Sequence, residues 1–179
     1  KDKLGGICLN WGCIPTKALL KNAEVYHTIK HADTYGIKVE NVSVDFKKNI
    51  QRSRDISNRL SKGIEFLMKK NKITHITGIG KLTSKTSLEV KNKQKTDIIE
   101  ADKIILATGA RPKTFPGMEF DGDRVISFKE AMILDSPPKK MIIIGSGAIG
   151  SEFAYYYNEF GTEVHIIEIL DRILPIEDA

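Results

Sequence analysis

The sequence predicts an α/β fold, and three observations support this prediction. Residues 140–168 have the pattern of a strand, a glycine-rich turn, a helix and a second strand, which is the order of a βαβ unit. Residues 45–70 carry apolar side chains at mostly helical spacing, and short strand-like runs follow them. Residues 103–107 form a further apolar run, predicted to be a buried strand, that ends in a sharp turn. Helices that alternate with strands in this way are typical of α/β proteins.

Length and composition indicate a globular chain. The 179 residues allow one domain or two small ones, and 41% hydrophobic and 28% charged residues are ordinary values for a soluble protein. No apolar run reaches the length of a membrane span or of a signal peptide. The net charge is +5, but the densest lysine cluster, at Lys91, Lys93 and Lys95, lies between two strand-like runs. We interpret it as a solvated hairpin turn, so we expect neither a membrane nor a nucleic acid as partner.

The first residues contain both cysteines of the chain, Cys8 and Cys13, within the run GGICLNWGCIPTK. A close cysteine pair of this kind favours redox chemistry or metal binding over a structural disulfide. A zinc site needs four ligands, and the four histidines are scattered without a second Cys or His pair, so no metal is predicted. The alternative is a pair of small buried thiols that never react.

The two cysteines can meet only if the chain between them is irregular. On a regular helix, residues five apart point roughly 140° away from each other. Gly12 permits an irregular turn, and Pro15 suits the first turn of a helix predicted over residues 15–31. Cys13 then lies at or just before the helix N-terminus, where the dipole and free N–H groups are expected to lower its pKa and favour a thiolate. Cys8 is the freer of the two to react.

The middle of the chain is predicted to hold one long helix and a meander. The helix covers residues 45–70, with Asp45 as N-cap. Its expected buried positions are Phe46, Ile50, Leu60, Ile64, Leu67 and Met68. Three short strands follow at 73–79, 87–91 and 97–101.

Residues 140–144 are predicted to form a buried parallel strand, and the glycine-rich turn after it predicts a dinucleotide site. In G-x-G-x-x-G the first glycine makes the tight turn, the second lets the backbone approach a pyrophosphate, and the third lets the helix at 151–160 pack on the strand. The predicted cofactor-binding residues are Gly145, Ser146, Gly147, Ala148, Ile149 and Gly150. Glu168 ends the next strand, at 163–168, 18 residues after Gly150. Its carboxylate can accept from ribose hydroxyls and would repel a 2′-phosphate, so NAD is favoured over NADP. The alternative is a glycine-rich turn without a ligand.

The run GGICLNWGCIPTK resembles the active-site signature of the disulfide-reductase flavoproteins. It is most similar to the members that act on dihydrolipoyl groups, as is the segment 168–175, and more loosely similar to glutathione and mercuric reductases. The resemblance implies that Cys13 faces the flavin and that Cys8 exchanges with the dithiol substrate. It also implies that Lys17 reaches the flavin ring.

The same resemblance implies the domain organisation. Residues 107–112 are similar to the A-T-G-x-x-P segment of these flavoproteins, which places Ala107, Thr108 and Gly109 beside FAD. The backbone at Gly80 is expected near the adenosine end of FAD. The predicted architecture is two Rossmann-like dinucleotide-binding domains, for FAD over residues 1–112 and for NAD over 113–179, both incomplete, with a small antiparallel meander. Because the family's first glycine-rich unit and its interface domain with a His–Glu pair are not found, we expect an internal fragment that does not turn over alone.

The function implied by the resemblance is NAD-dependent oxidation of a protein-bound dihydrolipoyl group through the Cys8–Cys13 disulfide and FAD. The implied partners are the lipoyl domain of an acyltransferase (E2) in a 2-oxo acid dehydrogenase complex, or the H protein of glycine cleavage. A homodimer in the cytoplasm, or in the mitochondrial matrix of a eukaryote, is expected. The alternatives are another FAD-dependent disulfide reductase, of glutathione or mercuric reductase type, and a non-catalytic dinucleotide-binding fragment.

Overall fold

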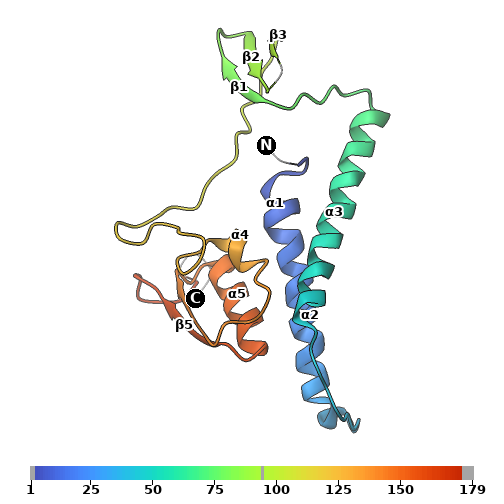
Figure 1. Ribbon diagram of the computed structural model, residues 1–179, viewed down its shortest axis with the longest axis vertical. Helices are drawn as coiled ribbons and strands as arrows, with labels where there is room; N and C mark the ends of the chain where they lie inside the picture. The colour runs from blue at the N-terminus through green and yellow to red at the C-terminus, as the bar shows by residue number, and fades with distance from the viewer. Residues whose placement is uncertain (1–2, 94, 175–179) are drawn as a thin grey trace.

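The computed structural model describes residues 3–93 and 95–174 and contains a pair of long helices, a small sheet and a βαβ unit (Figure 1). In chain order the elements are α1 (Gly6–Trp11), α2 (Cys13–Lys30), the 3-10 helix η1 (Ala32–Tyr35), α3 (Phe46–Lys70), β1 (Ile79–Leu82), β2 (Ser87–Lys91), β3 (Thr96–Glu100), α4 (Phe128–Ala131), β4 (Lys140–Ile144), α5 (Ala148–Glu159) and β5 (Glu163–Ile167). The mixture of helix and parallel sheet confirms the α/β class.

Helices α2 and α3 run side by side, and both were predicted (Figure 1). The α3 N-cap is Asp45, whose side chain accepts from the N–H of Lys48 at 2.9 Å, as the sequence indicated. Helix α2 begins two residues earlier than predicted, at Cys13. The expected burial of the second half of α3 is wrong. Leu60 and Leu67 are 40% and 47% exposed, and the buried positions beyond Ile50 are serines.

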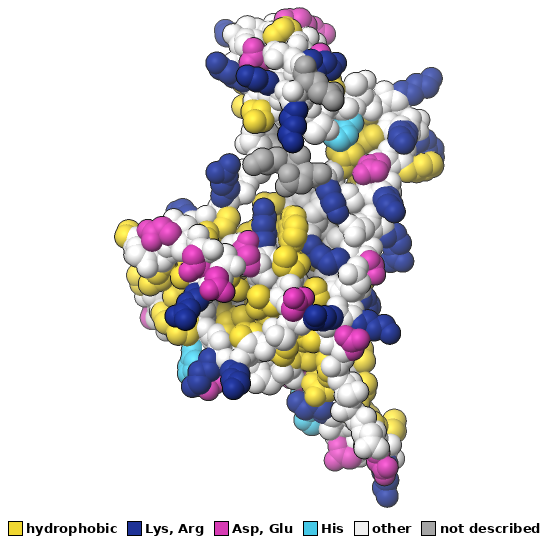
Figure 2. Space-filling view, viewed as in Figure 1, with side chains coloured by type: hydrophobic (Ala, Val, Ile, Leu, Met, Phe, Trp, Pro, Cys, Tyr) yellow, Lys and Arg dark blue, Asp and Glu magenta, His cyan; other side chains and the backbone are white. Residues whose placement is uncertain are grey.

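The small sheet is an antiparallel meander in the order β1–β2–β3. Strand β2 matches the prediction, and β3 begins one residue earlier than expected. The strand predicted at 73–79 is wrong, because residues 73–77 have no regular structure and β1 begins at Ile79. On the face of the whole molecule that Figure 2 shows, lysine and arginine side chains are interspersed with acidic ones.

Strands β4 and β5 pair in parallel, from Lys140 opposite Glu163 to Ile144 opposite Ile167, with α5 as the crossover. This is the predicted βαβ unit. The expectation that the first strand is buried on both faces is wrong, since Ile142 is 64% exposed. Only Met141 and Ile143 of β4 pack against the core.

The segment 103–110 corrects another prediction. It was expected to be a buried strand, but it has no regular structure, and the side chains of Ile105 and Leu106 are 91% and 69% exposed. A strand needs a neighbour to take its N–H and C=O groups. Within the described part of the chain, no strand lies beside this segment to supply one.

One apolar core joins the long helices to the βαβ unit. Its buried members are Leu19, Ala23, Phe46, Ile50, Ala131, Met132, Phe153, Tyr156 and Tyr157. They come from α2, α3, α5 and the α4 region, on both sides of the boundary placed between residues 112 and 113. The division into an FAD and an NAD domain therefore stays a prediction. Over the described ranges, no helix is both long and apolar enough to cross a membrane.

Candidate functional site

The two cysteines lie on either side of a helix break. Cys8 is in α1 and Cys13 is the first residue of α2, and both are free and exposed. The irregular backbone predicted between the cysteines is at Gly12, with φ −140° and ψ −121°, and the residues from Cys8 to Trp11 are helical. A Cβ on residue 12 would lie 3.2 Å from the Cα of Cys8 and 3.1 Å from the carbonyl oxygen of Ile7. The close approach of the two helices therefore favours glycine at this break.

The pKa of the Cys8 thiol is raised, first by the neighbouring Cys13 thiol and then by desolvation. The N–H groups of Cys13 and Ile14 at the start of α2 act on this pKa in the opposite direction. Cys8 therefore responds to groups on the other side of the Gly12 break. The expected lowering of the Cys13 pKa stays a prediction.

Helix α3 holds the backbone around this pair. Three of its side chains donate to carbonyl groups before, between and after the cysteines: Ser61 Oγ to Leu4 at 3.1 Å, Arg54 Nη1 to Asn10 at 3.0 Å, and Ser53 Oγ to Pro15 at 3.2 Å. Sequence reasoning missed these residues, since serine and arginine within an amphipathic helix carry no signal of such a role.

Lys17, predicted to reach a flavin ring, forms an ion pair with Glu152 of α5. The lysine side chain is 64% exposed and the glutamate 26%, so the pair contributes little to stability by itself. It links the cysteine-bearing helix to the helix that follows the glycine-rich loop. Sequence reasoning missed Glu152, although an acidic residue two positions after Gly150 was a usable signal.

The glycine-rich loop has the geometry expected of its three glycines. Gly145 has φ +99°, a conformation that glycine adopts without strain. A Cβ on Gly150 would lie 2.1 Å from the carbonyl oxygen of Gly145, so only glycine allows α5 to pack on β4 here. At Gly147, the N-cap of α5, a Cβ would meet nothing within 4 Å. The loop is therefore open where a pyrophosphate would approach.

The start of α5 suits an anion. The helix has 12 residues, its N-cap makes no side-chain hydrogen bond, and its first turn carries no acidic residue. The first N–H groups of such a helix lack backbone partners and attract negative charge. Ser146, Ala148 and Ile149 flank Gly147 at this end, as predicted. These residues fit a dinucleotide, and its binding by them stays a prediction.

Glu168 lies against the same loop. One carboxylate oxygen accepts from the N–H and the hydroxyl of Ser146, both at 2.8 Å. The other accepts from the N–H groups of Ile169 at 2.8 Å and Leu170 at 3.1 Å. These hydrogen bonds, first that of the Ser146 N–H, lower the pKa of Glu168 to about 2. An anionic carboxylate therefore stands beside the predicted nucleotide site.

The lowered pKa of Glu168 predicts a pH-dependent stability. Because the folded pKa is about 2 and the ordinary value is 4.5, the stabilisation is fully present above about pH 4.5 and is lost as the pH falls towards 2. Thermal unfolding midpoints should therefore be higher for wild type than for Glu168→Gln at pH 6, and the difference should shrink below pH 4.5. Ser146→Ala keeps three N–H donors, so it should show a smaller version of the wild-type profile. A wild-type advantage that stayed constant down to pH 2.5 would contradict this assignment.

The residues predicted to contact FAD are not brought together. Gly80 lies in β1, where a Cβ would meet Leu88 at an ordinary 3.4 Å, whereas Gly78 could not accept a side chain because Lys91 O would lie at 2.8 Å. Ala107, Thr108 and Gly109 lie in the exposed segment 103–110. The small sheet stands apart from α2, which carries Lys17 (Figure 1). The contact of these positions with FAD stays a prediction.

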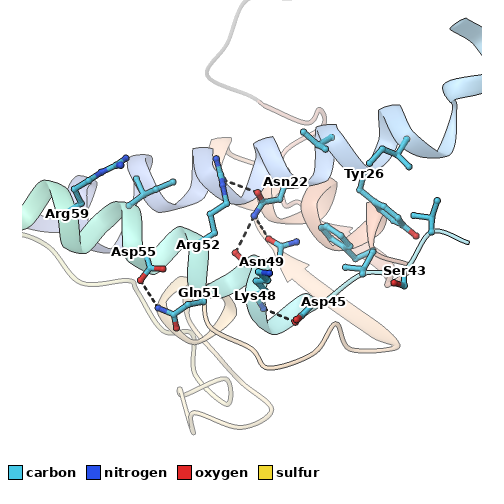
Figure 3. A pocket seen from close by; sticks show the side chains of 16 residues that line it. Asn22, Tyr26, Ser43, Asp45, Lys48, Asn49, Gln51, Arg52, Asp55 and Arg59 are labelled. Atoms are coloured by element: carbon cyan, nitrogen blue, oxygen red, sulfur yellow. Dashed lines mark hydrogen bonds between the residues drawn. The ribbon is translucent and has the colours of Figure 1, made fainter. Parts of the chain in front are cut away.

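A groove lies away from these residues. It has a volume of about 1020 Å³ and is formed by α2, α3, residues 42–45 and Phe160 (Figure 3). Asn22 and Arg52 are hydrogen-bonded along it, and none of the predicted site residues lines it. Among the residues described, no group of three or more His, Cys, Asp or Glu side chains could hold a metal ion.

Comparisons with known proteins agree with the two motifs. A family model described as pyridine nucleotide-disulphide oxidoreductase matches residues 2–179. Dihydrolipoyl dehydrogenase of Zymomonas mobilis is 47% identical over 177 residues, which are 98% of this chain and 38% of the relative. Dihydrolipoyl dehydrogenase of Chlorobaculum parvum is 44% identical over 180 residues, again 38% of its length. The crystal structure of LpdA from Mycobacterium tuberculosis matches with a TM-score of 0.90 and 26% identity, over 99% of this chain and 39% of that one. The chain thus spans about two fifths of these relatives.

Proposed function

Because the chain belongs to the pyridine nucleotide-disulphide oxidoreductase family, we propose that its protein is a dihydrolipoyl dehydrogenase that uses Cys8 and Cys13 as its redox pair. The observation that carries the proposal is the placement of the two exposed cysteines on either side of the Gly12 break, where Cys13 raises the pKa of Cys8. Relatives of this name cover the whole chain at 41–47% identity. The same observations favour this enzyme over a non-catalytic dinucleotide-binding fragment.

The cysteine pair performs a thiol–disulfide exchange. In the oxidised protein, a thiolate of the substrate dithiol attacks the Cys8 sulfur, and the Cys8–Cys13 bond breaks with Cys13 as the leaving thiolate. The second substrate thiol, once deprotonated, attacks the substrate sulfur of the mixed disulfide and releases Cys8. The substrate leaves as a disulfide, and two electrons remain on the two cysteines.

Two cofactors are proposed. NAD fits the described residues, because the loop at Gly147 is open, α5 presents its N-terminus, and Glu168 stands beside Ser146. When bound, NAD would accept the two electrons that leave the protein. FAD is proposed on the family relationship, with Lys17, Gly80, Ala107, Thr108 and Gly109 as the residues expected to contact it.

The proposed substrate is a dihydrolipoyl group on the lipoyl domain of an E2 acyltransferase or on an H protein, with a homodimer in the cytoplasm as the working form. The proposal is tested by dihydrolipoamide-dependent reduction of NAD, together with thiol titration and flavin absorbance of the purified protein. A protein that reduces glutathione disulfide or mercuric ion but does not oxidise dihydrolipoamide would belong to another branch of the family. A protein with no redox-active thiols and no flavin would be a binding fragment.

Glu168 predicts the choice of nucleotide. A carboxylate at the end of β5 accepts from the ribose hydroxyls and repels a 2′-phosphate, so kcat/KM should favour NAD over NADP by at least about tenfold, or 1.4 kcal/mol. Glu168→Gln should shrink that preference, mostly by weakening NAD. Glu163→Gln, at the opposite end of the same strand and paired with Lys140, is the matched control and should leave the preference unchanged. Equal efficiency with both nucleotides in the wild type would show that Glu168 does not read the ribose.

A further inference from the structure

The face of α3 that lies towards the cysteine-bearing helices is polar. Ser53, Ser57 and Ser61 recur every four residues and are only 0%, 3% and 3% exposed. An apolar face at these positions would bury more hydrophobic surface, whereas serine leaves a hydroxyl that needs a partner. Ser53 and Ser61 donate to backbone carbonyl groups outside their own helix. The serines of this face therefore bind backbone carbonyl groups of the neighbouring segment and do not serve as apolar packing.

Arg54 lies within this face and makes the most extensive contacts. One nitrogen donates to the carbonyl oxygen of Asn10 at 3.0 Å, and the other lies 3.2 Å from the Met132 sulfur. Its guanidinium covers the ring of Trp11, with its central carbon 4.7 Å from the ring centroid. Burial lowers its pKa, and its Nε has no hydrogen-bond partner among the described residues. A half-buried, partly unsatisfied cation carries a desolvation cost, so its position needs a reason other than stability.

The carbonyl that Arg54 binds lies at the helix break. Asn10 is two residues after Cys8 and three before Cys13, in the last turn of α1. Its own side chain donates to the carbonyl groups of Leu4 at 2.9 Å and Gly6 at 3.0 Å, which closes α1 on itself. Because α1 is one short helix held in this way, fixing the position of Asn10 fixes Cys8. Ser53 holds the other side of the break through Pro15.

We propose that Arg54 is a positioning residue of the redox pair: by holding the Asn10 carbonyl it fixes α1 against α2 and keeps the Cys8 and Cys13 sulfurs at bonding range. The proposal rests on the proposed function of the cysteines. A disulfide forms only within a narrow range of Cβ separation, about 3.5–4.5 Å. Holding the thiols close before they react raises their effective concentration and favours the disulfide over the dithiol. Loss of Arg54 should shift the pair towards the dithiol.

The measurement is the equilibrium of the pair with glutathione. One glutathione disulfide takes two electrons from the two thiols, the Cys8–Cys13 bond forms, and two glutathione thiols carry away the two protons. The purified protein is equilibrated over a range of glutathione ratios, quenched with acid and alkylated, and its dithiol fraction is read by mass. For Arg54→Met the equilibrium constant for disulfide formation should fall about tenfold, which is about 30 mV for a two-electron couple. Arg54→Lys keeps one donor and should shift less.

Arg52→Met is the matched control. Arg52 is on the same helix and also donates to a backbone carbonyl, that of Ala18 at 3.0 Å, and to Asn22, but it is remote from the break. The Arg52→Met variant should unfold at a lower temperature than the wild type, as Arg54→Met does. Its glutathione equilibrium should stay at the wild-type value. If Arg54→Met does not fold, Arg54→Lys carries the comparison.

The outcomes separate this inference from the proposed function. A wild-type protein that forms no Cys8–Cys13 disulfide at any glutathione ratio would overturn the redox role of the pair itself. If the cysteine pair of the wild type and that of the Arg54 variants become half oxidised at the same glutathione ratio, only the role of Arg54 is overturned. Equal shifts in the Arg52 and Arg54 variants would also overturn it, because the effect would then follow general loss of stability.

Discussion

Cys8→Ser is expected to abolish dihydrolipoamide oxidation, by at least about a thousandfold in kcat/KM, because a serine oxygen cannot form or exchange a disulfide. Cys13→Ser should have the same effect, since Cys8 then has no partner with which to form the disulfide that the substrate thiolate attacks. Both cysteines are exposed, so neither change removes a buried contact. Steady-state kinetics with dihydrolipoamide and NAD measure the loss.

The loss of activity can be assigned to the missing thiol only if the fold of each variant is intact. Each variant should unfold within about 1 kcal/mol of the wild type in denaturant, as exposed substitutions generally do. Each should also bind NAD with wild-type affinity, because the glycine-rich loop lies on another element. A Cys8 variant that turned over dihydrolipoamide normally would show that the pair is only structural.

Gly150→Ala is expected to have the largest effect on stability. Its Cβ would lie 2.1 Å from the Gly145 carbonyl oxygen and 3.2 Å from a methyl group of Ile143. Backbone cannot yield as a flexible side chain does, so α5 would have to move off β4, at a cost of about 3 kcal/mol or more. Chemical denaturation of wild type and variant measures the difference.

Gly147→Ala is the matched control for Gly150→Ala. At Gly147 φ is −65° and ψ is 177°, which alanine adopts freely, and its Cβ would meet nothing within 4 Å. Stability should change by no more than about 1 kcal/mol. NAD binding should weaken at least tenfold, because the methyl group would occupy the space through which a pyrophosphate approaches. Equal loss of stability at both positions would mean that the loop does not have this geometry.

The local motifs were predictable from sequence because their geometry is set by nearby residues. Gly145, Gly147 and Gly150 specify a turn, an opening and a close contact within six residues. The N-cap of α3 at Asp45 and the break at Gly12 are likewise local. Backbone conformation and sterics over a few residues decide such features, so the pattern carries them directly.

Burial was predicted poorly, because it depends on what lies across the fold. Leu60 and Leu67 have the spacing of an apolar helix face, yet they are exposed, and Ser57 and Ser61 are buried instead. The exposed segment at Ile105 has the composition of a buried strand but no strand beside it in the part of the chain that is described. The spacing of apolar residues shows that a helix or strand has an apolar face. It does not show which other element packs against that face.

The sequence by itself determined the α/β class, the cysteine pair, the glycine-rich loop and the acidic residue that ends β5, since each is a short-range pattern with one physical meaning. Only the tertiary structure decided that Lys17 pairs with Glu152. It alone showed Arg54 on the Asn10 carbonyl. The residues paired in these two side-chain contacts are 135 and 44 positions apart in the sequence. Such distant pairs form only when the packed core brings their helices together.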